Sequence, residues 1–163
     1  MPHKYLLNEF EDFARSAAKA ESLMGYVSER IHRHIPRYNW VGFYLVDPGD
    51  SGALVLGPYA GSFTPNPRMS FNQGLCGATA STGRVTVADN VAQDPRYVEA
   101  FDMVKSQISA PVTAFRKLVA VFNVESYFIS SFQPALERQF VESCTRIVGK
   151  CLERIAAAHY VDA

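Results

Sequence analysis

A single cysteine flanked by glycines is the residue of this sequence best placed for chemistry. Cys76 lies in the stretch Asn72–Gly77, read Asn-Gln-Gly-Leu-Cys-Gly, at the start of a predicted short helix. Glycine lets the backbone turn tightly and lets a ligand come close. A thiol at a helix N-terminus can have a lowered pKa and become reactive. The alternative is a buried, inert cysteine in a tight turn, because free cysteine is among the most buried residue types.

Three polar residues on two predicted strands form a second candidate cluster. Residues 107–112 and 117–125 read as strands. Alternation places Gln107 and Ser109 on one face of the first strand, and Asn123 and Glu125 on one face of the second. If the strands pair, these side chains converge as hydrogen-bonding groups with one carboxylate among them. The alternative is that they face water, as one side of an antiparallel sheet often does.

The other cysteines and the histidines do not indicate a metal site. Cys144 and Cys151 lie on the apolar stripe of one predicted helix, about 10 Å apart along its axis, which is too far for a disulfide. None of the four histidines stands at a zinc-like spacing from a cysteine. We therefore expect two core cysteines, no structural metal and no cofactor.

Two terminal helices are predicted to support these residues. Apolar residues at alternating spacings of four and three predict one helix over residues 5–35, which Pro36 ends. This stripe either packs on its own domain or meets a second subunit in part. Pro134 is the expected first residue of the last helix. The two stripes are Leu6, Phe10, Phe13, Ala17, Ala20, Met24, Val27 and Ile31, and Leu136, Phe140, Cys144, Ile147, Cys151 and Ile155.

An aromatic segment over residues 38–46 is the clearest strand. Alternation places Tyr38, Trp40, Gly42 and Tyr44 on one face, and Gly42 leaves a gap between large side chains. Such a gap can hold a small ligand or be filled by a neighbouring side chain. Residues 53–59 complete a hairpin with this strand.

The middle of the chain is predicted to be mostly loop. Residues 61–70 read as a loop over the sheet, 78–81 as a short helix, 84–88 as a brief strand and 98–105 as a helical turn or two. The whole pattern predicts one α+β domain over residues 1–163. Its central antiparallel sheet would carry the N- and C-terminal helices on one face, with loops and short helices over a ligand pocket on the other.

The composition is that of an ordinary globular protein. Hydrophobic residues make up 48% of the 163 residues and charged residues 20%. Sixteen Lys and Arg balance sixteen Asp and Glu without a basic stripe, so we expect no nucleic-acid partner. No apolar run has the length of a signal peptide or a membrane span. We expect a cytoplasmic protein with no membrane association.

Three motifs resemble those of a known family. They are the run Tyr38–Leu45, the segment Leu56–Tyr59 with Gly61, and Gly74–Gly77 with Ala80. Together with the order of the elements, they closely resemble the single-domain GAF proteins that act as free methionine-R-sulfoxide reductases. The resemblance covers nearly the whole chain. It implies a GAF (profilin-like) fold, a buried small-ligand pocket, a homodimer and a cytoplasmic setting.

The sequence departs from that family at the residues of the reaction. In the family, one cysteine attacks the sulfoxide and others resolve the sulfenic acid as a disulfide. Here Asn66 and Ala100 occupy the positions of two of those cysteines, and Cys76 alone is retained, at a resolving position. Gln107 and Asn123 replace two pocket carboxylates of the family. An amide forms hydrogen bonds but cannot balance a cation as a carboxylate does.

These observations favour a non-catalytic GAF-type module, a degenerate relative of the reductases. It would bind or sense a small polar metabolite such as an amino-acid derivative. One alternative is a thiol-dependent free methionine-R-sulfoxide reductase that uses Cys76 as its catalytic residue; another is a structural or dimerisation role with a vestigial pocket. Trp40 and Tyr44 would wall the pocket above the turn around Cys76. The expected ligand-binding residues are Trp40, Tyr44, Cys76, Gln107, Asn123 and Glu125.

Overall fold

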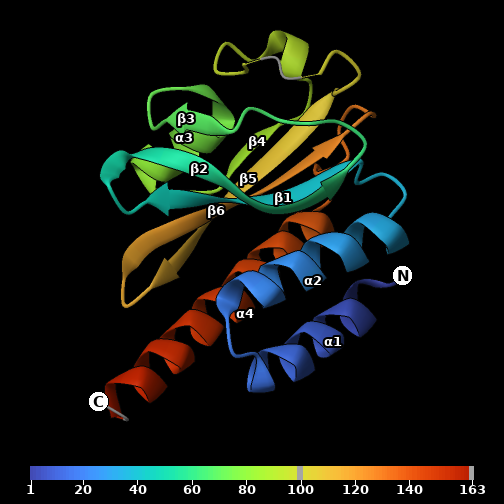
Figure 1. The fold of residues 1–163 in the computed structure, drawn as a ribbon. Helices are drawn as coiled ribbons and strands as arrows, with labels where there is room; N and C mark the ends of the chain where they lie inside the picture. The colour runs from blue at the N-terminus through green and yellow to red at the C-terminus, as the bar shows by residue number, and fades with distance from the viewer. Residues whose placement is uncertain (99–100, 162–163) are drawn as a thin grey trace.

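A six-stranded antiparallel sheet forms the centre of the molecule (Figure 1). The computed structural model describes residues 1–98 and 101–161. Its strands are β1 (Trp40–Asp47), β2 (Asp50–Gly61), β3 (Arg68–Ser70), β4 (Thr86–Ala88), β5 (Ser106–Ala114) and β6 (Lys117–Ser126). Across the sheet they lie in the order β3-β2-β1-β6-β5-β4, so the first and last long strands of the chain, β1 and β6, pair at the centre.

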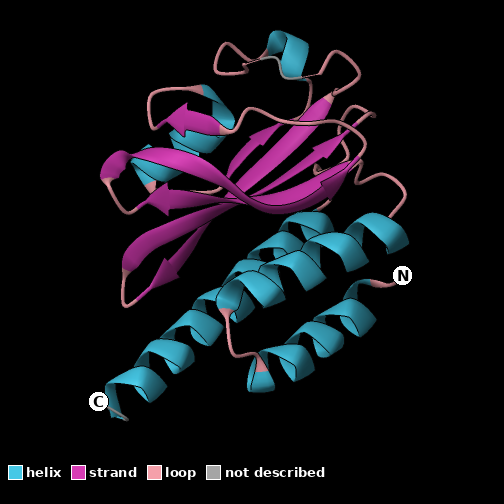
Figure 2. Ribbon diagram, viewed as in Figure 1, coloured by secondary structure: helices cyan, strands magenta, loops and turns pink. Residues whose placement is uncertain are grey.

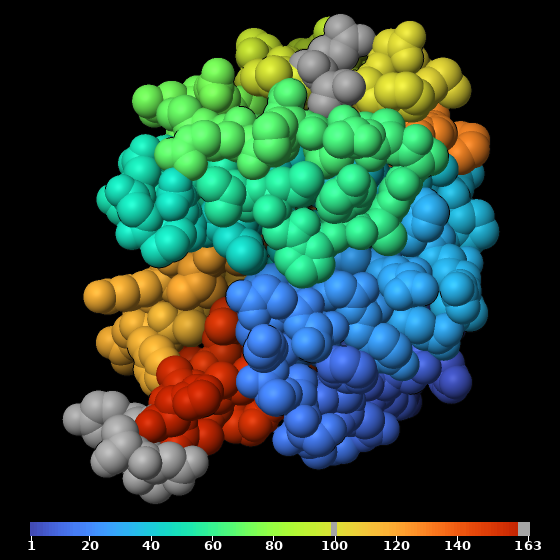
Figure 3. All heavy atoms as spheres, viewed as in Figure 1, coloured from blue at the N-terminus to red at the C-terminus, as the bar shows by residue number. Residues whose placement is uncertain are grey.

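The helices divide between the two faces of the sheet (Figure 2). Helices α1 (His3–Ser16), α2 (Ala20–His34) and α4 (Ala135–Val161) lie on one side, with α2 and α4 against the strands and α1 packed on both of them. Helix α3 (Gly74–Thr82) and the 3₁₀ helix η1 (Val91–Gln93) lie on the other side. The space-filling view shows the blue N-terminal helices below the teal and green strands and the yellow-green loops above them (Figure 3). This arrangement confirms the predicted α+β architecture.

Alternation along β1 explains why the sheet has two apolar faces. Val41 and Phe43 are buried in the large core between the sheet and the helices, whereas Trp40 and Tyr44 are buried in a smaller cluster under α3. Because successive side chains of a strand point to opposite faces, one strand supplies both clusters. In the described part of the chain, no helix is long and apolar enough to span a membrane.

The prediction of one helix over residues 5–35 is wrong. Helix α1 ends at Ser16 and α2 begins at Ala20, with Ala17 in an extended conformation. The apolar stripe is packed in the core in both helices, and α1 lies against both α2 and α4. One straight helix over residues 5–35 could not fold back on itself in this way. Arg154 of α4 donates hydrogen bonds to the carbonyl oxygens of Ala14 (2.8 Å) and Ala17 (2.6 Å) and so stabilises the break.

The structure differs from the sequence prediction in four smaller respects. Tyr38 precedes β1 and is buried among the helices beside Phe132 and Phe140, not on the face of Trp40. Leu136 is exposed, and α4 begins at Ala135, one residue after Pro134. The predicted loop over residues 61–70 contains β3. Residues 101–105 form turns, not helix, and residues 99–100 of that predicted helical turn lie outside the described residues.

Candidate functional site

A small buried cavity lies on the sheet face that carries α3. Its volume is about 30 Å³, and it is closed by the segment before α3 and by Val98. Side chains from β1, β5, β6 and α3 form its inner wall. The lining residues are Tyr44, Pro65, Asn66, Met69, Gly74, Leu75, Cys76, Val98, Gln107, Asn123 and Glu125.

The glycine turn places Cys76 over the sheet as predicted. Gly74, the first residue of α3, has φ of +67°, a conformation that other residues adopt only with strain. A Cβ atom at Gly77 would lie 2.9 Å from the carbonyl oxygens of Ser70 and Phe71. Both glycines are therefore needed for α3 to start sharply and to pack closely against the preceding segment.

Cys76 is buried and held as a neutral thiol. Its side chain is 2% exposed, and its sulfur lies 3.4 Å from the hydroxyl oxygen of Ser109. Burial raises the pKa of the Cys76 thiol to about 12; the nearby Glu125 raises it further and the Ser109 contact acts in the opposite direction. The activation suggested by its place near a helix N-terminus is therefore wrong, because desolvation of the thiolate outweighs any help from the helix.

The three polar residues of β5 and β6 converge as predicted. Gln107 lies opposite Glu125 in the strand register, and its Nε2 donates a 2.7 Å hydrogen bond to Asn123 Oδ1. The three side chains are only 3–6% exposed, so the alternative in which they face water is wrong. The antiparallel register of β5 and β6 brings the three side chains together. They are buried because α3 covers this face of the sheet.

Ser109 joins the thiol to this cluster and was not among the predicted site residues. Its hydroxyl donates a 2.8 Å hydrogen bond to Asn123 Oδ1. Either atom could be the donor in the contact between the Ser109 hydroxyl and the Cys76 sulfur, and Gln107 Nε2 also donates to this sulfur at 3.9 Å. The predicted alternation already placed Ser109 on the face of Gln107, and this was the signal that could have identified it.

Among the residues that the structure describes, Glu125 is the one carboxyl group that lines the cavity. Burial raises its pKa from its ordinary value of 4.5 to about 7, although a hydrogen bond from the Asn123 side chain acts in the opposite direction. Asn123 Oδ1 already accepts from Gln107 and Ser109, which leaves the Asn123 amide group as the donor to Glu125. A carboxyl with this pKa changes its charge near neutral pH.

Tyr44 lines the cavity, but Trp40 does not. Burial raises the pKa of the Tyr44 phenol, with smaller contributions from Cys76 and Glu125. The Trp40 ring stacks on Tyr59 at 5.4 Å and covers Gly42, where a Cβ atom would lie 2.7 Å from the ring. The predicted gap at Gly42 is therefore filled by Trp40 itself. Within the described residues, the buried Trp40 Nε1 has no hydrogen-bond partner.

The remaining cysteines lie elsewhere. Cys144 and Cys151 are buried in the core between the sheet and the helices, on the opposite face from Cys76, and all three thiols are free. This confirms the prediction of two core cysteines. Asn66 lines the cavity, whereas Ala100 lies outside the described residues.

Comparison with known proteins identifies the same fold. The GAF domain family matches residues 27–152. A free methionine-R-sulfoxide reductase of Saccharomyces cerevisiae is 26% identical over 69% of this chain, and the match spans 62% of the yeast protein. The structure of a free methionine-R-sulfoxide reductase from Neisseria meningitidis in complex with its substrate superposes with a TM-score of 0.88 at 22% identity, covering 96% of this chain and 91% of that one. The GAF domain of an Acinetobacter phosphoenolpyruvate-protein phosphotransferase gives 0.79 at 16% identity, covering 99% and 98%.

Proposed function

Because this chain belongs to the GAF domain family, we propose that it is a non-catalytic module that binds and senses a small polar metabolite in the cavity under α3. The ligand is an amine-bearing molecule such as an amino-acid derivative. The residues that contact it are Tyr44, Cys76, Gln107, Asn123 and Glu125, with Trp40 behind them.

The burial of Cys76 is the observation that carries this proposal: its side chain is 2% exposed and its sulfur lies 3.4 Å from the hydroxyl oxygen of Ser109. Burial raises the pKa of the thiol far above neutral pH, so the neutral thiol dominates at pH 7. Ser109 could stabilise a thiolate only by turning its proton away from Asn123 Oδ1, which would weaken the hydrogen-bonded cluster. A sulfur held in this way is part of the wall of a binding site and a poor nucleophile.

The chemistry of the cavity indicates an amine. Glu125 is buried at 6% exposure and has no cation among its hydrogen-bond partners in the described residues. A ligand ammonium group would pair with the ionised carboxylate and offset the desolvation free energy of that buried charge. Gln107 and Asn123 would then form hydrogen bonds with the uncharged polar groups of the ligand.

Binding requires the cavity to open. About 30 Å³ holds roughly one water molecule, so the segment with Pro65, Asn66 and Met69 must move outward to admit an amino-acid derivative. We propose that this change in the loop is the signal that the module transmits.

Thermal-shift measurements with a panel of free amino acids, their sulfoxides and their N-acetyl derivatives test the proposal. At least one amine-bearing compound should raise the melting temperature at pH 8, and its N-acetyl derivative should not. The stabilisation should be lost in Glu125→Gln and reduced in Trp40→Phe. The exposed Glu29→Gln variant is the matched control and should respond like the wild type. A panel without any response, or a response equal in Glu125→Gln, contradicts the proposal.

The second candidate function is reduction of free methionine-R-sulfoxide by Cys76, which the similarity to the yeast and Neisseria reductases favours. The thiolate would attack the sulfoxide sulfur, and oxygen transfer would leave methionine and a cysteine sulfenic acid. Two equivalents of an external thiol would then restore the thiol, releasing water and a disulfide. Methionine formation with dithiothreitol that disappears in Cys76→Ser would establish this activity and overturn the first proposal.

We also propose a homodimer in the cytoplasm, as the resemblance to single-domain GAF reductases implies. Sedimentation equilibrium over a range of protein concentrations would measure the mass directly. A monomer mass at all concentrations would contradict it without affecting the proposed binding function.

A further inference from the structure

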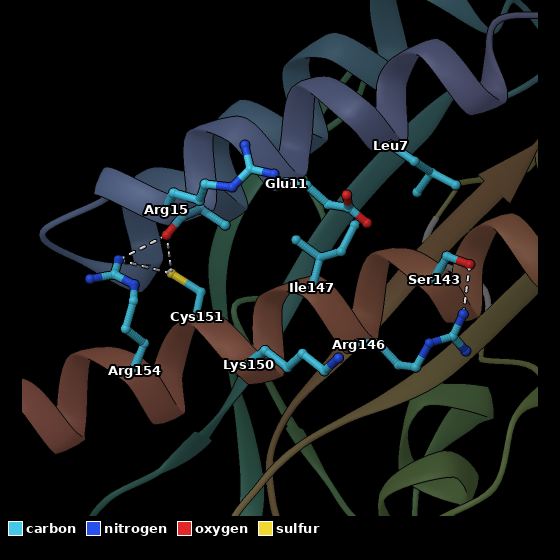
Figure 4. Close-up of a pocket in the computed structure, with 10 residues that line it drawn as sticks. Leu7, Glu11, Arg15, Ser143, Arg146, Ile147, Lys150, Cys151 and Arg154 are labelled. Carbon is cyan, nitrogen blue, oxygen red and sulfur yellow. Dashed lines mark hydrogen bonds between the residues drawn. The ribbon is translucent and has the colours of Figure 1, made fainter.

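A groove between α1 and α4 lies on the far side of the helices from the cavity. Its volume is about 410 Å³, and Figure 4 shows its two walls, with Glu11 and Leu7 on α1 facing Ile147 and Lys150 on α4. Leu7 and Ile147 are only partly buried, so the floor of the groove is apolar and accessible. The groove therefore offers both apolar contact and charge.

Cations dominate the rim of this groove. Arg146, Lys150 and Arg154 follow one another at four-residue spacing, which places them along one side of α4. Arg15 adds a fourth cation, already paired with Asp12, whereas Glu11 is the single carboxylate of the lining. None of the ion pairs within residues 1–98 and 101–161 involves the three cations of α4. The whole chain has equal numbers of basic and acidic residues, so its composition does not reveal this short basic stripe.

The second side of α4 extends the basic surface. Arg146 and Lys150 also line a depression of about 450 Å³ toward the β5–β6 turn, where Arg116 lies. Glu153 borders this depression, but its carboxylate accepts a hydrogen bond from the backbone N–H of Phe115. Arg146 and Lys150 are thus accessible from both sides of α4, and neither forms an ion pair within the described part of the chain.

Arg154 fixes the shape of the groove. Its Nη2 donates to the carbonyl oxygens at the end of α1, at 2.8 Å from Ala14 O and 2.6 Å from Ala17 O. This contact holds the C-terminal end of α1 at a set distance from α4. The groove is therefore a preformed feature of the packing, and binding would require little rearrangement.

We propose that this groove binds an acidic, amphipathic segment of a partner protein. Apolar side chains of the segment would contact Leu7, Ala14 and Ile147, and its carboxylates would pair with Arg146 and Lys150. The wall from residue 143 to residue 154 is about 17 Å long, which matches about three helical turns or five extended residues. This surface is independent of the proposed ligand site, which lies across the sheet.

Two other occupants fit less well. A second copy related by a two-fold axis through the groove would place the basic stripe against itself, and like charges in contact are unfavourable. A nucleic acid has no apolar groups for the floor beyond its bases, and strong binding to its backbone needs more cations than this groove offers. Charge and apolar area together favour an acidic peptide.

The test uses a fluorescein-labelled 12-residue peptide of glutamates with leucine at every fourth position. Fluorescence anisotropy should show binding by the wild type that is about tenfold weaker in the double variant Arg146→Glu/Lys150→Glu. Arg84→Glu, a charge reversal of the same kind in the α3–β4 connection, is the control and should bind like the wild type. Glu11→Gln should bind at least as tightly, because it removes the opposing charge.

The position of the bound peptide is read from amide resonances in a ¹⁵N-labelled protein. Shifts confined to residues 7–15 and 143–154 support the proposal. Binding that is unaffected by Arg146→Glu/Lys150→Glu overturns it, as does equal binding of a peptide in which serine replaces every leucine. Tighter binding by oligothymidylate, or by vesicles with a quarter phosphatidylserine, also overturns it in favour of those partners.

Discussion

Replacement of Glu125 by glutamine should change how the stability of the protein depends on pH. The native carboxyl has a pKa of about 7, raised from 4.5 by burial, whereas the unfolded chain has the ordinary value. Between these two values the native state holds a proton that the unfolded state has released. The free energy of unfolding therefore falls as pH rises through this window, because the unfolded state binds fewer protons.

The size of the effect follows from the two pKa values. The contribution of Glu125 to stability is full below pH 4.5 and lost by about pH 7, and the loss amounts to about 3 kcal/mol. The nearby thiol of Cys76 and phenol of Tyr44 have pKa values raised by burial, so they stay neutral in this window. Glutamine resembles the protonated carboxyl in shape and charge, and it removes the titration.

Urea denaturation of both proteins at pH 5 and pH 7.5 measures the difference. The variant should gain about 2 kcal/mol relative to the wild type between these two pH values, which span most but not all of the titration. Taking the difference cancels the other titrating groups that the two proteins share. Glu29→Gln, at an exposed carboxylate, should give a difference close to zero. Parallel pH profiles for the wild type and Glu125→Gln would refute the reasoning, since Glu125 would then titrate alike in both states.

Three further predictions follow from the same contacts. Because burial raises the pKa of the thiol, Cys76 in the folded protein should react with iodoacetamide at least about a hundred times more slowly than in urea. Mass spectrometry of the peptide that contains Cys76 measures both rates, and equal rates would show an accessible thiolate. Gly74→Ala should lower the free energy of unfolding by about 1–2 kcal/mol because of its φ of +67°, whereas Gly49→Ala, which meets no close neighbour, should be near neutral in the same urea titration. Arg154→Ala should cost about 1 kcal/mol by releasing the end of α1 and should increase amide hydrogen exchange at residues 14–17; unchanged exchange there would refute the capping role.

The sequence alone was enough to predict the polar cluster and every strand of the described sheet except β3. Alternation along β5 and β6 placed Gln107, Asn123 and Glu125 on one face, and the register of the pair then brought them together. Strand periodicity is a local property, so it survives without knowledge of the rest of the fold. Whether that face is wet or buried depends on α3 and the segment before it, which local pattern cannot decide.

The errors arose where long-range packing overrides local pattern. The apolar stripe of residues 5–35 continues unbroken through Ala17, and neither glycine nor proline marks the break. The partner that stabilises it, Arg154, is far along the chain and is recognised only in the folded structure. Likewise, the raised pKa of Cys76 depends on burial under the loops and on the carboxyl of Glu125, neither of which the glycine turn reveals.

The hydrogen bonds around Ser109 link the states of Cys76 and Glu125. While Ser109 donates to Asn123, it cannot also donate to a thiolate of Cys76, and the Asn123 amide is directed to Glu125. Ionisation of Glu125 raises the cost of forming a thiolate at Cys76 further, because two negative charges would share one buried cavity. Glu125→Gln should therefore increase the rate at which iodoacetamide alkylates Cys76 at pH 8, where the wild-type carboxyl is ionised. An unchanged rate would show that the two groups are not coupled.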